Sequence, residues 1–232
     1  MDKIFGTDED DKTSDQSKVQ SELYKDPTLE DIERLKMKAR IAIVDDEEVP
    51  YAKSLTNNGY NIHYYSDIDN IDEFLRKRYH VIVLDIQGVG KELSKKHQGF
   101  GVLKYIKSEC PHVVILVYTG GRFSFAMYRE ESTLADDFID KDVDFLEFKL
   151  KTDEAIRKAF SPSYHADIRE KTLKKEIDNM ETYEKVLRIM EKHHPMEKEK
   201  IISQLKKTAP NAGNRLVQKV EHYLASMTDI IL

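Results

Sequence analysis

The chain has 232 residues, 40% of them hydrophobic and 34% charged, with a net charge of −6. This length suits one domain of ordinary size plus a smaller unit. The acidic balance does not suggest a protein that coats nucleic acid, and no apolar run approaches the roughly 20 residues needed to cross a bilayer. The polar N-terminus lacks a signal-peptide pattern and the single cysteine cannot form an internal disulfide, so we expect a cytoplasmic protein without membrane partners.

The N-terminal part of the chain is polar. Residues 1–26 are rich in Asp, Lys, Ser and Gln and poor in large apolar residues, which predicts a flexible acidic tail. Residues 27–38 are predicted to form a short helix, because Pro27 and Thr28 stand at its start, acids lie in its first turn and bases in its last. The folded part is therefore expected to begin near residue 27.

Residues 39–161 alternate between two patterns. Five short apolar segments have the length and the β-branched or aromatic content of strands, and stretches with helical spacing lie between them. The predicted strands are residues 41–44, 61–66, 81–84, 113–118 and 136–140. Parallel strands need crossover connections, and strands buried on both faces are continuously apolar. The predicted fold class is α/β, a flavodoxin-like (βα)5 doubly wound sheet of order 2-1-3-4-5, followed by an all-α extension.

Residues 162–232 are predicted to be helical, as two or three amphipathic helices for dimerisation or output. Apolar residues recur every three or four positions in two stretches: Leu173, Ile177, Met180, Tyr183, Leu187 and Met190, then Leu216, Val217, Val220, Tyr223, Leu224 and Met227. A helix-turn-helix with Arg215 and Lys219 in a DNA-reading helix is possible but not favoured, because the region has 13 basic and 11 acidic residues. His193 and His194 precede Pro195 and are interpreted as a helix boundary.

Acidic residues follow two of the predicted strands. Asp45 and Asp46 follow the first strand and Asp85 ends the third. In the order 2-1-3-4-5 these strands are neighbours, so the three carboxylates are expected to meet in one crevice at the carboxyl edge of the sheet. Carboxylates so close repel one another unless a cation lies among them, and hard oxygen ligands suit Mg²⁺.

Two further side chains are expected at the same edge. Thr119 ends the fourth strand and Lys141 follows the fifth. A carboxylate nucleophile, a divalent cation, a hydroxyl donor and a lysine are the groups that phosphoryl transfer requires. The sequence therefore predicts a site for phosphoryl chemistry.

With these residues in place, residues 39 to about 161 resemble the receiver domain of two-component response regulators. The resemblance implies that Asp85 is the phosphoacceptor, and that Thr119 and Lys141 contact the phosphoryl group. It implies a Mg²⁺ site formed by Asp45, Asp46, Asp85 and the backbone carbonyl of Gln87, and it places Phe138 at the switching aromatic position. The implied partners are a sensor histidine kinase or phosphotransfer protein, with a homodimer or a protein partner at the C-terminal helices. The only chemistry expected is self-phosphorylation from small donors and self-dephosphorylation.

The sequence departs from the receiver pattern in three places. Asp142 stands where the family usually has proline, and Gly120 stands where alanine usually follows the threonine. The segment 87–101 is longer than usual, which leaves open a lid, a partner contact or a mobile loop. Two alternatives stay open. One is a pseudo-receiver adaptor that never accepts phosphate. The other is a haloacid-dehalogenase-like phosphatase, whose first motif needs a second aspartate where Gln87 stands.

Overall fold

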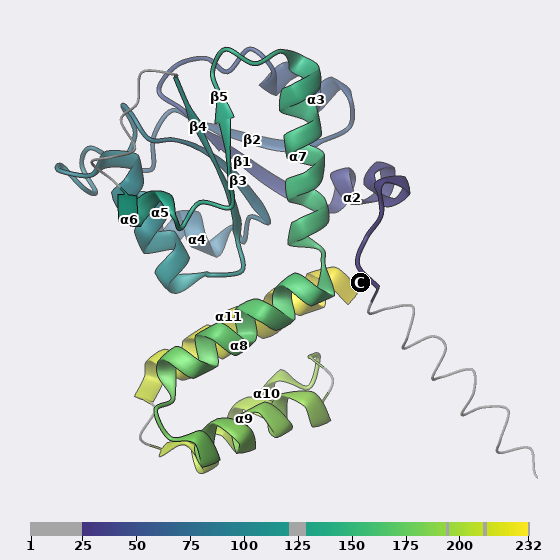
Figure 1. Ribbon diagram of the computed structural model, residues 1–232, viewed down its shortest axis with the longest axis vertical. Helices are drawn as coiled ribbons and strands as arrows, with labels where there is room; N and C mark the ends of the chain where they lie inside the picture. Colours follow the sequence, from purple (N-terminus) through teal and green to yellow (C-terminus); the bar gives the residue numbers. More distant parts are fainter. Residues whose placement is uncertain (1–24, 121–128, 194, 211–212, 232) are drawn as a thin grey trace, which may run out of the picture.

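The computed structural model describes residues 25–120, 129–193, 195–210 and 213–231 (Figure 1). The flexible tail predicted for residues 1–26 lies almost entirely outside the described residues, and so does His194. The short helix predicted for residues 27–38 is present as a 3-10 turn, η1 (Leu29–Asp31), followed by α2 (Ile32–Lys38).

A five-stranded parallel sheet of order β2-β1-β3-β4-β5 forms the centre of the larger unit (Figure 1). Its strands are β1 (Arg40–Val44), β2 (Asn61–Tyr65), β3 (Val81–Asp85), β4 (Val114–Thr119) and β5 (Asp137–Asp140). All four neighbouring pairs are parallel. The predicted fold class and strand order are therefore confirmed.

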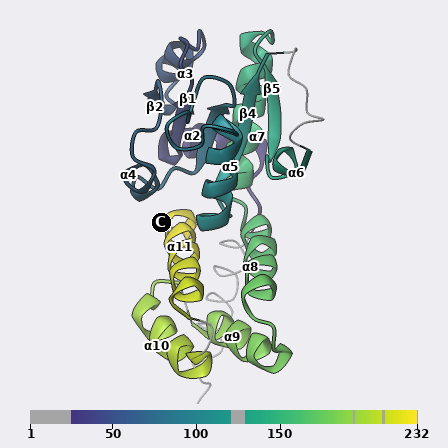
Figure 2. The same ribbon diagram turned by 90° about the vertical axis from the view of Figure 1, so that its left-hand side faces the viewer.

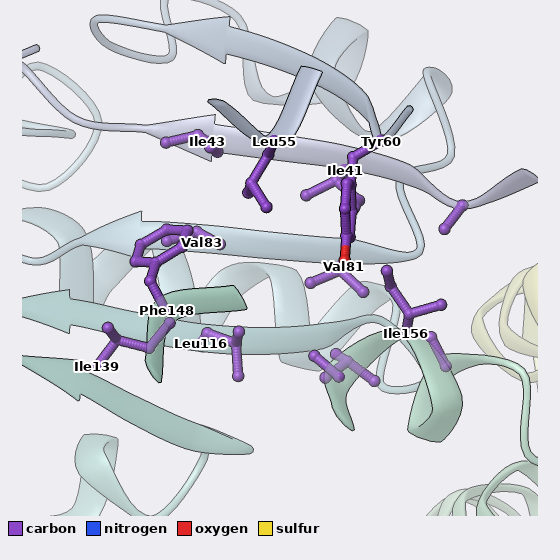
Figure 3. Packing of buried hydrophobic residues seen from close by; sticks show 14 of the residues in the cluster. Ile41, Ile43, Leu55, Tyr60, Val81, Val83, Leu116, Ile139, Phe148 and Ile156 are labelled. Atoms are coloured by element: carbon purple, nitrogen blue, oxygen red, sulfur yellow. The ribbon is translucent and has the colours of Figure 1, made fainter. Parts of the chain in front are cut away.

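Helices cover both faces of the sheet. One face is covered by α2, α3 (Ala52–Asn57) and α7 (Phe145–Ala159), whose side chains pack on alternate residues of the strands, as Phe148 does against Val83 and Leu116 (Figure 3). The other face is covered by α4 (Ile71–Arg76) and α5 (Gln98–Glu109). A short helix, α6 (Arg129–Ser132), precedes β5. Because both faces are buried, the inner strands had to be apolar at every position.

Four further helices form a second unit with its own core. They are α8 (Pro162–Glu176), α9 (Met180–Lys192), α10 (Lys198–Thr208) and α11 (Gly213–Ile231). The prediction of two or three helices was wrong, because the apolar period of residues 173–190 continues across a chain reversal in which the Asn179 side chain caps α9. The predicted boundary near His193 is confirmed, since α9 ends at Lys192.

The helical unit lies against the amino-terminal edge of the strands. Figure 2 shows α8 and α11 below the sheet, with α9 and α10 farther from it. Arg78, just before β3, donates from Nη2 to the Ala225 carbonyl of α11 at 2.6 Å. The carboxyl edge, where the acidic residues lie, is on the opposite side of the sheet. Within the described part of the chain, no helix has the length and apolar character to span a membrane.

Candidate functional site: a carboxylate cluster at the sheet edge

Three aspartates meet where β1 and β3 end. The two strands pair in register, with Val44 opposite Leu84, so the residues that follow them lie side by side. Each of Asp45, Asp46 and Asp85 offers a carboxylate oxygen, and these oxygens all lie within 4.8 Å of one another. Asp45 and Asp85 are buried, whereas Asp46 is exposed. The convergence predicted from the strand ends is thus present in the structure.

Backbone amides orient the two buried carboxylates. Asp45 Oδ1 accepts from the Glu47 N–H at 2.8 Å, and Asp85 Oδ1 accepts from the Gln87 N–H at 2.9 Å. Both are side-chain turns in which an aspartate bonds to the amide two residues later. They leave the second oxygen of each carboxylate, Oδ2, directed to the centre of the cluster.

The ammonium group of Lys141 lies between the two buried carboxylates. Its Nζ is 2.8 Å from Asp85 Oδ2 and 2.9 Å from Asp45 Oδ2, and the ring centroid of Tyr118 is 5.4 Å away. Burial alone would lower the pKa of Lys141, but the hydrogen bonds to the two aspartates outweigh it and raise this pKa. Burial raises the pKa of Asp85, assisted by the charge of Asp45 and opposed by the bonds from Gln87 and Lys141.

Thr119 and Phe138 occupy neighbouring positions on β4 and β5. Thr119 is buried, and its hydroxyl has no hydrogen-bond partner among the described residues. Phe138 is partly buried on the α5 face of the sheet and pairs with Val117, two residues before Thr119. Side chains two apart on a strand share a face, so Phe138 and Thr119 are diagonal neighbours on that face.

The loop after β5 is closed without a proline. Asp142 donates its N–H to Asp140 Oδ1 at 2.9 Å, and Lys141 donates its N–H to the Thr119 carbonyl at 3.0 Å. A proline at position 142 would lack the N–H that makes the first of these bonds. The departure from the receiver pattern at Asp142 is therefore compatible with a lysine directed into the cluster.

The long segment after β3 packs against the domain. Val89 is fully buried, and Gly90 donates its N–H to Asp67 Oδ1 at 2.7 Å. Lys91 brings its Nζ to 4.0 Å from Asp46 Oδ2 at the exposed side of the cluster. This segment contributes a cation near the site as well as part of the core.

The donor set fits a hard divalent cation. Three carboxylates converge, and Lys141 bonds to only two of their six oxygens. Carboxylate oxygens are the ligands that Mg²⁺ prefers, usually with several waters retained. Asp45, Asp46 and Asp85 are the residues that could hold it.

Sequence reasoning missed two residues that shape the site. Tyr64 on β2 donates its hydroxyl to the Asp45 carbonyl at 2.7 Å and so holds the turn that carries the acid pair. Gly88 has a φ of +88°, and a Cβ built there would lie 2.1 Å from Asp46 Oδ1. The glycine in "IQGVG" was a visible turn signal, but nothing in the sequence indicated that Tyr64 reaches the neighbouring loop.

Solved structures similar to the chain include several receiver domains. The receiver domain of NtrX from Brucella abortus shares 24% identity, with a TM-score of 0.42, and the match covers 50% of this chain and 97% of that one. The beryllofluoride-activated NtrC4 receiver domain dimer shares 24% identity, with a TM-score of 0.44, covering 53% and 99%. Brucella abortus NtrX in complex with ATP shares 20% identity, with a TM-score of 0.46, and the match covers 61% of this chain but only 34% of that one.

No protein-family model matches the chain, and no curated protein matches it either. The likeness to the solved structures concerns the fold, which the observed strand order β2-β1-β3-β4-β5 shows directly. The fold expected from the sequence is confirmed at this level: residues 40–159 form a doubly wound parallel sheet of order β2-β1-β3-β4-β5, with helices added after it.

Proposed function

We propose that the protein is a response regulator in which Asp85 accepts a phosphoryl group and thereby switches the C-terminal helical unit. The observation that carries the proposal is the ammonium of Lys141, which lies 2.8 Å from Asp85 and 2.9 Å from Asp45 within a cluster of three carboxylates. A nucleophile, an acidic cation site and a fixed positive charge thus share one sheet edge. A purely structural ion pair would need only Lys141 and the two buried aspartates, so the exposed carboxylate of Asp46 favours a functional site.

In the proposed reaction a carboxylate oxygen of Asp85 attacks the phosphorus of a phosphohistidine or a small acyl phosphate. A new P–O bond forms while the bond from phosphorus to the donor's nitrogen or oxygen breaks, and the donor leaves with that electron pair. Lys141 is close enough to bond to a phosphoryl oxygen in place of a carboxylate oxygen. Bound Mg²⁺ would supply further positive charge for the equatorial oxygens.

The proposed switch begins at Thr119. Its buried hydroxyl has no partner among the described residues, and a phosphoryl group on Asp85 would offer acceptor oxygens near it. Movement of the Thr119 side chain toward these oxygens would leave space beside it on the α5 face of the sheet, into which the Phe138 ring could move. A swing from 1:99 to 99:1 between two arrangements needs about 5.5 kcal/mol, which several charge-assisted hydrogen bonds can supply.

The proposed partners are a sensor histidine kinase or a phosphotransfer protein as donor, and a second copy or another protein at the helical unit. We propose residues 39–161 as the receiver and 162–232 as the output or dimerisation region. DNA binding is not favoured, because Lys219 is buried and its Nζ lies 2.6 Å from Glu176 Oε1, while Arg215 lies 3.8 Å from the same oxygen. Lys219 therefore does not project from α11, and the exposed side chain of Arg215 lies beside an acidic group.

The test is incubation of the full chain with acetyl phosphate and Mg²⁺, followed by intact-mass measurement. The expected result is a gain of one phosphoryl group that is stable in acid and labile in base, and that is absent in Asp85→Ala and with EDTA. Asp69→Ala, which changes an exposed aspartate of the loop after β2, is the matched control and should be phosphorylated normally. Absence of any adduct would support a pseudo-receiver adaptor, and continuous turnover of acetyl phosphate a phosphatase. Either outcome would overturn the proposal.

A further inference from the structure

A cleft of about 770 Å³ lies between the receiver domain and the helical unit. Its receiver wall comes from α4, the end of α5 and the starts of β3 and β4, and its other wall from α11, with single residues of α8 and α10. It is at the amino edge of the sheet, opposite the carboxylate cluster. Small-molecule sites commonly have this size and occur where two structural units meet.

Contacts across the rim hold the two walls together. Arg78 donates to the Ala225 carbonyl at 2.6 Å, and the His222 ring lies 3.1 Å from the Glu109 carbonyl through Nδ1. Arg78 has a φ of 55°, a left-handed conformation that is uncommon for a residue with a side chain. The cleft is therefore bounded by specific contacts between the units.

Four histidines line the cleft: His80, His112, His165 and His222. His165 is buried, and its Nε2 bonds to the Ala159 carbonyl at 2.8 Å. Burial lowers the pKa of His165 to about 4 and also lowers the pKa of His112. These two rings are therefore neutral at pH 7 and offer flat, polarisable surfaces beside the aromatic side chains of the receiver wall, Phe74, Tyr79 and Tyr105.

Charged groups of both signs stand on each wall. Asp72 and Arg76 line the receiver wall, and Glu221 and Lys198 line the helical wall. These four side chains form no ion pair with any residue that the structure describes. A ligand that carries both an anionic and a cationic group could therefore pair with charged groups that form no ion pair with the described residues.

A metal ion is a poorer occupant of the cleft. Among the described residues, the set of His, Cys, Asp and Glu ligand atoms close enough to share an ion is the cluster of Asp45, Asp46 and Asp85 at the other edge. In the cleft, Cys110 Sγ and His222 Nδ1 lie 3.5 Å apart, but no third ligand atom of a described residue completes a group of three with them. The cleft as built suits an organic molecule.

We propose that this cleft binds a small aromatic zwitterion, the chemical class of the aromatic amino acids. Its carboxylate bonds to Arg76 or Lys198, its ammonium group lies near Asp72 or Glu221, and its ring packs among the histidines and aromatic side chains. Because such a ligand contacts both walls, it favours the docked arrangement of the helical unit over any arrangement in which the cleft is open.

Cys110 supplies a reporter of cleft opening, because burial raises the pKa of its thiol to about 12 and alkylation then requires the cleft to open. It is the only cysteine of the chain, it lies in the cleft wall, and it is 6% exposed. The test measures alkylation of Cys110 by N-ethylmaleimide in the full chain, by intact mass, with and without L-phenylalanine or L-tyrosine. The expected result is slower alkylation with saturable concentration dependence, matched by binding in calorimetry. EDTA is present throughout, so the outcome does not depend on the carboxylate cluster or on phosphorylation.

Variants and partial ligands decide the chemistry of the site. Arg76→Ala combined with Lys198→Ala should raise the Kd about tenfold or more, since the double change removes both cations with which the carboxylate could form a charge-assisted bond. Lys200→Ala is the matched control, because Lys200 is an exposed lysine of α10 outside the cleft lining and should bind as the native chain does. Benzoate and phenethylamine lack one charge each, and glycine lacks the ring. Equal binding of any of these, no binding of either amino acid at millimolar concentration, or an unchanged Kd in the double variant would each overturn the proposal.

Discussion

Two buried threonines differ in whether their hydroxyl groups are satisfied. Thr152 on α7 donates its hydroxyl to the Phe148 carbonyl at 2.8 Å, whereas the Thr119 hydroxyl has no partner among the described residues. Removing a satisfied buried hydroxyl costs about 1 kcal/mol, but removing an unsatisfied one does not. We predict that Thr152→Val lowers the free energy of unfolding by about 1 kcal/mol, and that Thr119→Val leaves it unchanged or slightly raised.

The same pair of variants separates stability from function. Urea denaturation followed by circular dichroism measures the first, and the rate of adduct formation with acetyl phosphate measures the second. We expect Thr119→Val to slow phosphorylation or its conformational response, and Thr152→Val to leave both intact. Equal losses of stability in the two variants would contradict the view that the Thr119 hydroxyl is held for a ligand.

Two glycines with left-handed backbone differ in what surrounds them. Gly88 has a φ of +88° with Asp46 Oδ1 2.1 Å from a built Cβ, whereas Gly59 has a φ of +84° with its nearest neighbour, a Lys36 carbon, at 3.6 Å. Alanine at either position should cost about 1 kcal/mol of stability from the backbone conformation. Only Gly88→Ala must displace a carboxylate of the cluster. We predict at least a tenfold loss of Mg²⁺ affinity by calorimetry for Gly88→Ala, and none for Gly59→Ala; equal affinities would exclude Asp46 as a ligand.

At the scale of elements, one largely buried carboxylate at the start of β5 links this strand to two helices. Asp136, just before β5, pairs with Lys107 of α5 at 2.5 Å and Lys158 of α7 at 2.8 Å. Lys107 is nearly buried, so loss of the carboxylate leaves a buried charge without compensation. We predict that Asp136→Asn lowers stability by about 3 to 5 kcal/mol. Asp137→Asn, which removes a half-exposed partner of Lys151, should cost less than about 1 kcal/mol.

The pH dependence of this pair follows from the direction of one shift. Burial would raise the pKa of Asp136, but the two lysines outweigh it, so the folded-state pKa lies below the usual 3.8. The unfolded chain then binds a proton more readily than the folded one, and the contribution is full above pH 3.8 and lost as the pH falls further. The difference between native and Asp136→Asn should be constant from pH 7 to pH 5 in urea titrations and should shrink below pH 4. A difference that shrinks already near neutral pH would contradict this assignment.

The sequence predicted the strands and helices that have a periodic apolar pattern. It did not predict individual contacts between side chains that lie far apart in the chain. Runs such as residues 81–84 indicated buried strands, and chain order alone brought Asp45, Asp85 and Lys141 to one edge. The boundary between α8 and α9 was hidden because the apolar period continues across it. Asp136 was read as part of a weak strand, since its lysine partners lie on two other elements and only the folded chain brings them together.

At the scale of the whole molecule, the two edges of the sheet have different surroundings. The carboxyl edge carries the carboxylates and Lys141, and the amino edge carries the junction with the helical unit. α7 spans the sheet between them: Asp144 caps its start near the loop after β5, and Phe160 after its end stacks on His80 at 4.9 Å. A change at the carboxyl edge, such as the proposed phosphorylation of Asp85, therefore has one continuous helix through which to reach the junction.

The last prediction concerns whether the two units unfold together. The sheet cores and the helical core share no buried residue, although Tyr164 and Ile230 of the helical unit pack against one sheet core, and we propose two separate folding units. Val83 in the sheet and Val186 in α9 are equally buried, at 1% and 0% exposure. Each valine-to-alanine change should destabilise its own unit by about 2 kcal/mol and leave the other unchanged.

Hydrogen exchange of backbone amides, followed by mass spectrometry of peptides, distinguishes the outcomes. Val186→Ala should speed exchange in residues 162–231 only, and Val83→Ala in the residues of the sheet and its covering helices only. Because the units are joined through α7 and α8, some acceleration at residues 159–165 is expected in both variants. Uniform acceleration across the chain by either change would mean that the junction couples the units into one cooperative body. A phosphoryl group at Asp85 would then act on the stability of the whole molecule, not on the position of one unit against the other.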